Sequence, residues 1–294
     1  MQNIVVKAEN LVKTFGKAKA LDGVNLELGA GEVYGFIGPN GAGKSTTIRT
    51  LLGVLKADSG TAQIFGRDAW QDAVDIHKRL AYVPGDVNLW ENLTGGEIID
   101  LFLRLKGGVD RQYKDELIEK FDFDPTKKAS TYSKGNRQKV ALVAAFSSDA
   151  DLYILDEPTS GLDPLMELVF HDCVAKVKAQ GKTVLLSSHI LSEVEKLCDR
   201  LSIIRNGKIV DTGTLQEMRH LSRTNITVRT AQPVTSLHEM NGVYDISENA
   251  GFISFRTDSD ATGAVIKVLS DAGITQITVT PPTLEELFLS HYGL

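Results

Sequence analysis

The sequence predicts an α/β fold followed by a small α+β domain. Strand and helix signals alternate through about residue 220, which is the pattern of an α/β fold. Within this region, a glycine-rich loop at residues 38–46 lies between an apolar strand signal at 32–37 and a helix signal at 46–52. Beyond Leu221, Thr, Val and Ile become more frequent, and the expected element order β-α-β-β-α-β is that of a ferredoxin-like domain. We therefore expect one domain over residues 1–220 and an accessory domain over residues 221–294.

The strands of the first domain are predicted by two kinds of pattern. Polar and apolar side chains alternate over residues 5–11 and 24–28, which predicts half-exposed strands of an antiparallel β subdomain, and residues 61–66 predict another strand. A short apolar run at residues 80–83, before Pro84, predicts a further strand. Two continuous apolar runs, at 152–155 and 183–186, are typical of buried parallel strands. Residues 201–204 and 207–210 predict a hairpin that turns at Asn206 and Gly207.

Helix signals dominate residues 88–149, so we expect an α-helical subdomain inserted there, with helices near 96–106 and 112–121. In the accessory domain the expected elements are a strand, a short helix, a hairpin, a helix and a strand: residues 226–230, 234–240, 242–247 with 252–257, 260–272 and 274–280. A last helix is expected after the proline pair, where Thr283 caps residues 284–289.

The composition is that of a soluble globular protein, with 42% hydrophobic and 24% charged residues. The net charge of −6 argues against nucleic acid as a partner. No apolar run approaches the roughly 18 residues that span a bilayer, and the N-terminus has no signal-peptide pattern, so we expect a cytoplasmic protein. Cys173 and Cys198 have no metal-ligand spacing and are expected to be core thiols.

The loop at residues 38–46 fits G-x-x-x-x-G-K-[ST], the P-loop that wraps phosphate. Its glycines allow close backbone approach, and its N–H groups and the helix start face the negative charge. Lys44 can reach the β- and γ-phosphates of ATP, and the Ser45 hydroxyl can hold Mg²⁺. The expected nucleotide-binding residues of this P-loop NTPase core are Gly38, Pro39, Asn40, Gly41, Ala42, Gly43, Lys44, Ser45 and Thr46.

Two carboxylates follow the apolar strand signal at residues 152–155. Asp156 is expected at the sheet edge near the P-loop, where it can bind Mg²⁺ directly or through water. Glu157 is expected to face the other way, as strand alternation requires, and to polarise an attacking water beside the γ-phosphate.

With these motifs the chain resembles the nucleotide-binding subunit of an ABC transporter, over about residues 3–220. The P-loop corresponds to the Walker A motif of that family, and Asp156 and Glu157 to its Walker B pair. Residues 160–163 match the D-loop, and residues 187–189 match the switch loop, in which His189 contacts the γ-phosphate. The resemblance also implies that Phe15 stacks on adenine, although a core position is an alternative for this side chain.

The signature helix of the family usually begins with L-S-G-G-Q, and here the segment at residues 132–136 reads Y-S-K-G-N. Ser133 and Gly135 are retained and open a helix whose N-terminus can point its N–H groups at a phosphate. The resemblance implies that this phosphate belongs to the ATP held by a second copy. The form with Lys134 is similar to that of bacterial drug-exporter-like ATPases. Gly85 stands where the family has the Q-loop glutamine. Asp86 either supplies an oxygen in its place or is an exposed turn carboxylate.

The resemblance implies an ATPase in which two copies clamp two MgATP head to tail and drive a separate membrane permease. Its partner would dock near the helical insertion and residues 86–92, where Leu89 and Trp90 are candidate contacts, with core packing as the alternative for Trp90. Export of a drug-like or other hydrophobic compound is the function that the signature variant and the accessory domain favour. The alternatives are an ABC ATPase outside transport, a nucleotide-sensing module without turnover, and an importer subunit.

Overall fold

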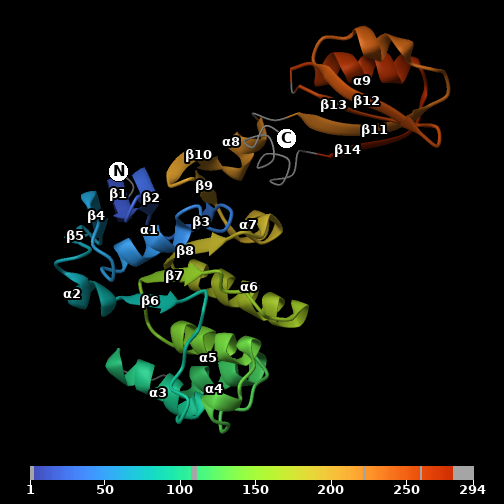
Figure 1. Ribbon diagram of the computed structural model, residues 1–294. Helices are drawn as coiled ribbons and strands as arrows, with labels where there is room; N and C mark the ends of the chain where they lie inside the picture. Colours follow the sequence, from blue (N-terminus) through green and yellow to red (C-terminus); the bar gives the residue numbers. More distant parts are fainter. Residues whose placement is uncertain (1–2, 107–110, 221–222, 259, 281–294) are drawn as a thin grey trace. The chain divides into compact units, whose positions relative to one another are not determined.

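The computed structural model describes residues 3–106, 111–220, 223–258 and 260–280 (Figure 1). Its internal contacts divide the chain into two compact units, Met1–Thr212 and Gly213–Leu294. The division precedes helix α8 (Leu215–His220), so it lies earlier than the boundary expected after residue 220. Thr214 and Glu217 explain the start of α8, because each side chain accepts a hydrogen bond from the backbone N–H of the other.

A six-stranded sheet with the order β10-β9-β3-β8-β7-β6 forms the centre of the first unit. Strand β3 runs parallel to β8 and β9, and β7 runs parallel to β6 and β8. Strands β3, β7 and β8 are buried along their whole length, which explains their continuous apolar runs. The strands are β3 (Val33–Ile37), β6 (Leu80–Val83), β7 (Leu152–Asp156), β8 (Thr183–Ser188), β9 (Arg200–Arg205) and β10 (Lys208–Thr214).

The antiparallel β subdomain is a four-stranded sheet with the order β2-β1-β4-β5. Strands β1 and β2 are longer than their alternating segments, because irregularities in their pairing interrupt the polar–apolar pattern, among them one near Asn10, whose φ is 50°. The strands are β1 (Ile4–Phe15), β2 (Ala18–Gly29), β4 (Ser59–Ile64) and β5 (Arg67–Asp68). One buried cluster joins both sheets, and Ile48 and Leu51 of helix α1 belong to it.

The helical subdomain between β6 and β7 is confirmed, and it contains α3, α4 and α5 (Figure 1). Helix α3 begins where Thr94 and Glu97 form a capping box. The helices of the first unit are α1 (Lys44–Leu51), α2 (Ala73–His77), α3 (Gly95–Leu105), α4 (Arg111–Lys120), α5 (Lys134–Phe146), α6 (Pro164–Ala179) and α7 (Leu191–Leu197), with a 3₁₀ turn at Ala129–Thr131. No helix in the described part of the chain combines the length and apolar composition needed to cross a membrane.

The second unit has the strand order β12-β13-β11-β14, all antiparallel, which is the order of a ferredoxin-like sheet. Its own core includes Val265 and Leu269 of α9, which pack with Ile226 and Val228 of β11. The expected helix at 234–240 is a 3₁₀ turn, because the segment is only about one turn long before Gly242 takes a φ of 81°. The elements are β11 (Thr224–Thr230), the 3₁₀ turn (Thr235–Glu239), β12 (Val243–Asn249), β13 (Phe252–Thr257), α9 (Thr262–Asp271) and β14 (Ile274–Thr280). The helix expected at 284–289 lies outside the described residues.

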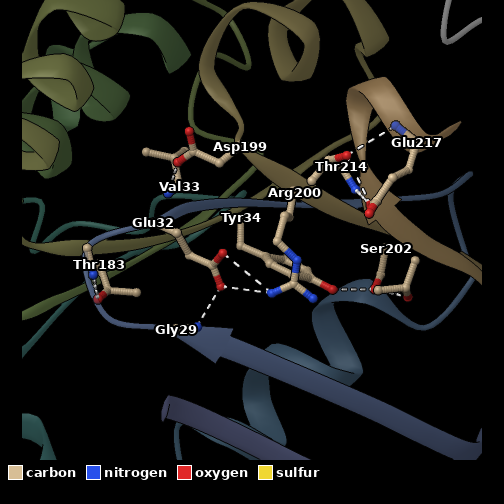
Figure 2. Close-up of polar contacts among 12 residues, drawn as sticks. Gly29, Glu32, Val33, Tyr34, Thr183, Asp199, Arg200, Ser202, Thr214 and Glu217 are labelled. Carbon is tan, nitrogen blue, oxygen red and sulfur yellow. Dashed lines mark hydrogen bonds and ion pairs between the residues drawn. The ribbon is translucent and has the colours of Figure 1, made fainter. Parts of the chain in front are cut away.

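Figure 2 shows the polar contacts that hold the beginning of strand β3. Glu32 is buried, and its Oε1 accepts a hydrogen bond from the Gly29 N–H at 2.5 Å and lies 3.4 Å from Nη1 of Arg200. The Val33 N–H donates to Asp199 Oδ2 at 2.9 Å. These contacts tie the β2–β3 turn to the start of β9, so they fix the position of the strand that leads into the glycine-rich loop.

Candidate functional site

The glycine-rich loop joins the buried end of β3 to the first turn of α1. Gly43 has a φ of 115°, and a Cβ there would lie 2.9 Å from the Ala20 carbonyl oxygen, so the position requires glycine. No side chain in the described part of the chain caps α1, so the N–H groups of its first turn face the loop. Uncapped N–H groups at a helix start form a binding site for an anion such as phosphate.

Lys44 is the first residue of α1, directly after the loop, and its side chain is only 5% exposed. Its Nζ donates hydrogen bonds to the carbonyl oxygens of Gly38 at 2.7 Å and Pro39 at 3.3 Å. The same Nζ lies 3.5 Å from Oε1 of Glu157. The ammonium group is therefore held among oxygen atoms at the position where an anion bound by the loop would meet it.

Asp156 and Glu157 both lie at the carboxyl end of β7, but the reason predicted for the direction of Glu157 is wrong. Asp156 is the last residue of the strand, and its buried carboxylate accepts a hydrogen bond from Ser187 Oγ on the neighbouring β8. Glu157 lies beyond the strand in the left-handed region, with a φ of 49°. This backbone turn, and not strand alternation, directs its side chain.

His189 follows β8 directly, and its imidazole lies near the carboxylate of Glu157. Its Nδ1 lies 3.4 Å from Oε1 of Glu157, and half of the His189 side chain is exposed. The same carboxylate oxygen therefore contacts Lys44 and His189. Residues distant in the sequence are brought together here, because β3, β8 and β7 are neighbours in the sheet and end at the same edge.

Gly85 lies beside this edge, where a Cβ would be 3.2 Å from the Asp156 carbonyl oxygen. A side chain at this position would press against the backbone that carries Asp156 and Glu157. Asp86 is exposed, in agreement with its interpretation as a turn carboxylate. Tyr82 is a further neighbour of Asp156: burial and the nearby Asp156 charge raise the pKa of Tyr82 to about 12.

The segment at residues 132–136 is a helix start on the helical subdomain. The Ser133 side chain caps α5 by accepting a hydrogen bond from the Asn136 N–H at 3.2 Å. A Cβ on Gly135 would lie 2.5 Å from the Gly161 carbonyl oxygen, and Lys134 Nζ donates to Ser160 Oγ at 2.8 Å. Within the described residues, no hydrogen bond or ion pair joins Ser133 to the glycine-rich loop.

Phe15 and Trp90, for which the sequence left a core position open as an alternative to a contact with a ligand or partner, are both exposed. Phe15 at the end of β1 is 52% exposed, with Lys13 Nζ 5.8 Å from its ring centroid. Trp90 is 53% exposed and contacts Phe102 of α3, with ring centroids 5.9 Å apart. Neither ring is a core residue, so each can meet a ligand or a partner.

The core positions predicted for Cys173 and Cys198 are confirmed, since both are buried free thiols.

Two polar residues at the site had no role in the sequence-based prediction. Ser187 donates to the Asp156 carboxylate, and Gln138 of α5 is buried and donates to the Pro158 carbonyl oxygen at 2.9 Å. A glutamine close in sequence to the apolar residues Val140 and Leu142 is the sequence signal that could have identified Gln138.

Comparisons with known proteins give the family of this chain. The profile of the ABC transporter family matches residues 21–160, and that of the C-terminal domain of DrrA1-3-like ATP-binding proteins matches residues 213–292. The daunorubicin resistance ATP-binding protein DrrA3 of Streptomyces coeruleorubidus is 32% identical over 100% of this chain and 97% of its own length. The bacitracin transport ATP-binding protein BcrA of Bacillus licheniformis is 30% identical, over 98% of this chain and 97% of its own.

A solved ATP-binding subunit of an ABC transporter is similar in structure, with a TM-score of 0.69 and 32% identity. The similarity covers 74% of this chain and 92% of that subunit. The family profile, the full-length relatives and the solved subunit therefore agree on the family of this chain. The chain belongs to the ATP-binding subunits of ABC transporters, a family of ATPases.

Proposed function

We propose that this ATPase powers an exporter by closing around two MgATP as a head-to-tail dimer. The observation that carries the proposal is the division of the site within one chain. Lys44, Glu157 and His189 meet at the edge of the central sheet, whereas Ser133 and Gly135 begin a helix that, within the described residues, has no hydrogen bond or ion pair to the glycine-rich loop. A second copy in the opposite orientation supplies that helix start to the ATP of the first.

The chemistry proposed for the first group follows from its contacts. The N–H groups of residues 38–46 hold the phosphates, and Lys44 balances the charge of the β- and γ-phosphates. Glu157 takes the proton of the attacking water, and His189, which lies beside it, contacts the γ-phosphate. Phe15, exposed at the end of β1, stacks on adenine.

Mg²⁺ fits the oxygen donors present at this edge. Asp156 supplies one buried carboxylate and Ser45 a hydroxyl at the start of α1. Within the described residues, no cluster of three His, Cys, Asp or Glu side chains could hold a metal. A site with few protein ligands suits Mg²⁺, which keeps waters and takes its other ligands from substrate phosphates. The ion would neutralise charge that develops on those phosphates.

The proposed direction of transport and cargo rest on the relatives. Proteins named for daunorubicin resistance and bacitracin transport match this chain over nearly its whole length. We therefore infer export of a drug-like or other hydrophobic compound through a separate permease, at the inner face of the cell membrane. Trp90 and the half-buried Leu89, beside α3, are the proposed contacts of that permease. In inside-out vesicles that contain the permease, ATP should drive uptake of the compound; ATP-driven loss would identify an importer.

The dimer is tested with a variant that binds ATP without hydrolysing it. Glu157→Gln removes the proposed base and leaves Lys44 in place, so with MgATP it should elute as a dimer and lose at least about 100-fold in turnover. Lys44→Ala is the matched control, because it removes the main cation at the phosphates and should stay monomeric. A monomer for Glu157→Gln at every protein concentration, with ATP shown to be bound, would refute the head-to-tail arrangement.

A further inference from the structure

Glu193 is a buried carboxylate outside the residues assigned above. It lies in the first turn of α7 and is 5% exposed. Its Oε2 accepts a hydrogen bond from Ser188 Oγ at 2.6 Å. Its Oε1 has no hydrogen-bond partner within the described residues. Such a group is costly to keep inside a protein, so its contacts call for an explanation.

The Ser188 hydroxyl is shared between Glu193 and the backbone. While Ser188 donates its proton to Glu193, its oxygen accepts a hydrogen bond from the Ile190 N–H at 2.9 Å. Ser188 and Ile190 are the two residues that flank His189. The carboxylate therefore sets the direction of the hydroxyl proton, which leaves the oxygen free to close the loop around the histidine.

Helix capping does not account for this arrangement. An acidic residue in the first turn of a helix usually accepts the N–H of the cap residue, as Glu97 does at α3. Glu193 instead bonds a side chain that lies before the cap residue Ile190. The pKa of Glu193 is raised, mainly by burial and also by the charge of Glu167, while the hydroxyls of Ser188 and Thr159 and the nearby His189 lower it. The polar contacts that favour the carboxylate thus come from the switch loop and from the segment after Glu157.

We propose that Glu193 is a positioning residue for ATP hydrolysis: it fixes the Ser188 hydroxyl and, through it, the loop that holds His189 beside Glu157. The inference rests on the proposed function, because that function gives His189 and Glu157 their roles. It adds a residue that acts through the Ser188 hydroxyl. The distance that it controls is the 3.4 Å between His189 Nδ1 and Glu157 Oε1.

The test compares Glu193→Ala, Glu193→Gln and Ser188→Ala in steady-state ATP hydrolysis by the full chain. Both alanine variants should lower kcat about 10- to 100-fold, since a displacement of about 1 Å at a reacting group has this effect. Their KM for ATP should change less than about threefold, because the P-loop is untouched. Glu193→Gln keeps an oxygen acceptor for Ser188 and should recover most of the activity. The double alanine variant should be no slower than the slower single variant, because both substitutions break one link.

A structural readout accompanies the kinetics. The imidazole NMR signals of His189, assigned with His189→Ala, should shift in Ser188→Ala, while those of His77, which bonds the distant Leu52 carbonyl oxygen, should not. Ser188→Ala removes only a hydroxyl, so it tests the hydrogen bond between Ser188 and Glu193 even if Glu193→Ala impairs folding. Ser192→Ala, at an exposed position of the same helix, is the control and should keep the wild-type rate.

Three outcomes would overturn the inference: wild-type kcat in Ser188→Ala, a loss in Glu193→Gln as large as in Glu193→Ala, or unchanged His189 signals. The proposed function fails by a different result. If His189→Ala and Glu157→Gln hydrolyse ATP at the wild-type rate, the assigned roles are wrong. If those two variants lose activity while Ser188→Ala does not, only the role of Glu193 is wrong.

Discussion

The carboxylate of Glu157 lies between Lys44 and His189 because its backbone leaves the path of the strand directly after Asp156. A φ of 49° is uncommon for glutamate and costs roughly 1 kcal/mol or more. In this conformation Glu157 makes its contacts at 3.5 Å to Lys44 and 3.4 Å to His189. At the residue scale, the arrangement of the site is thus set by a backbone angle that a sequence pattern does not encode.

Burial at single residues also gives a pH dependence that can be measured. Cys173 of α6 is 5% exposed, and burial raises the pKa of its thiol from 9.0 to about 12. Above pH 9 the unfolded thiol ionises while the folded one does not, so ionisation lowers the free energy of the unfolded state relative to the folded state. The stabilising contribution of this group is therefore complete below about pH 9 and is lost as the pH rises towards about 12.

We expect urea unfolding of the wild type to show this loss relative to Cys173→Ala, which has no thiol. The difference in unfolding free energy between the two proteins should move against the wild type by up to about 1.4 kcal/mol per pH unit above pH 9. Measurements at pH 8 and pH 10.5 suffice. An unchanged difference between these pH values would contradict the assigned cause.

At the scale of elements, the start of α5 is fastened to the segment that follows Glu157. Lys134 contacts Ser160, Gly135 packs against Gly161, and Gln138 bonds the Pro158 carbonyl oxygen. The helix proposed to bind the ATP of a second copy is therefore joined to the loop that follows the proposed base. A change in either element reaches the other through these contacts.

Gly135→Ala tests this junction. Its Cβ would lie 2.5 Å from the Gly161 carbonyl oxygen, so either α5 or the loop must move. We expect turnover to fall about 10-fold or more while ATP binding to the single chain is kept. Gly263→Ala in α9 is the matched control, because nothing lies within 4 Å of its Cβ and alanine favours a helix by up to about 1 kcal/mol. Equal turnover in both variants would mean that the junction tolerates movement.

At the scale of the whole molecule, the chain contains two units with separate buried cores. The core of the first joins the two sheets and α1, and the core of the second lies among β11, β13 and α9. All predicted site residues belong to the first unit. The second unit is the part matched by the DrrA-like C-terminal profile. Each core should therefore respond separately to a cavity placed within it.

Leu269→Ala tests this separation in the full chain. Leu269 is fully buried in the second core, so its truncation should cost about 2–5 kcal/mol there. Hydrogen exchange of the β11 and β13 amides should accelerate, while that of β3, β7 and β8 should stay as in the wild type. Leu185→Ala, a fully buried position in the first core, should give the reverse pattern. Equal acceleration in both units after either substitution would show one cooperative fold.

The sequence by itself determined the features that depend on neighbouring residues. The P-loop, the buried parallel strands, the turn at Asn206 and Gly207 and the helix start at Ser133 follow from local backbone requirements and hydrophobic periodicity. The full length of β1 could not be predicted from the sequence, because irregular pairing with β2 interrupts the alternation of polar and apolar residues by which a strand is recognised.

Only the tertiary structure decided which of these features meet. Lys44, Glu157 and His189 follow three neighbouring strands, and the sheet order brings Lys44 Nζ to 3.5 Å and His189 Nδ1 to 3.4 Å from the same oxygen of Glu157. The proximity of Gly85 to Asp156 and the contact of Glu193 with Ser188 were equally beyond a motif search. The physical reason is that a motif specifies local conformation, whereas distances between loops depend on how strands pair and pack.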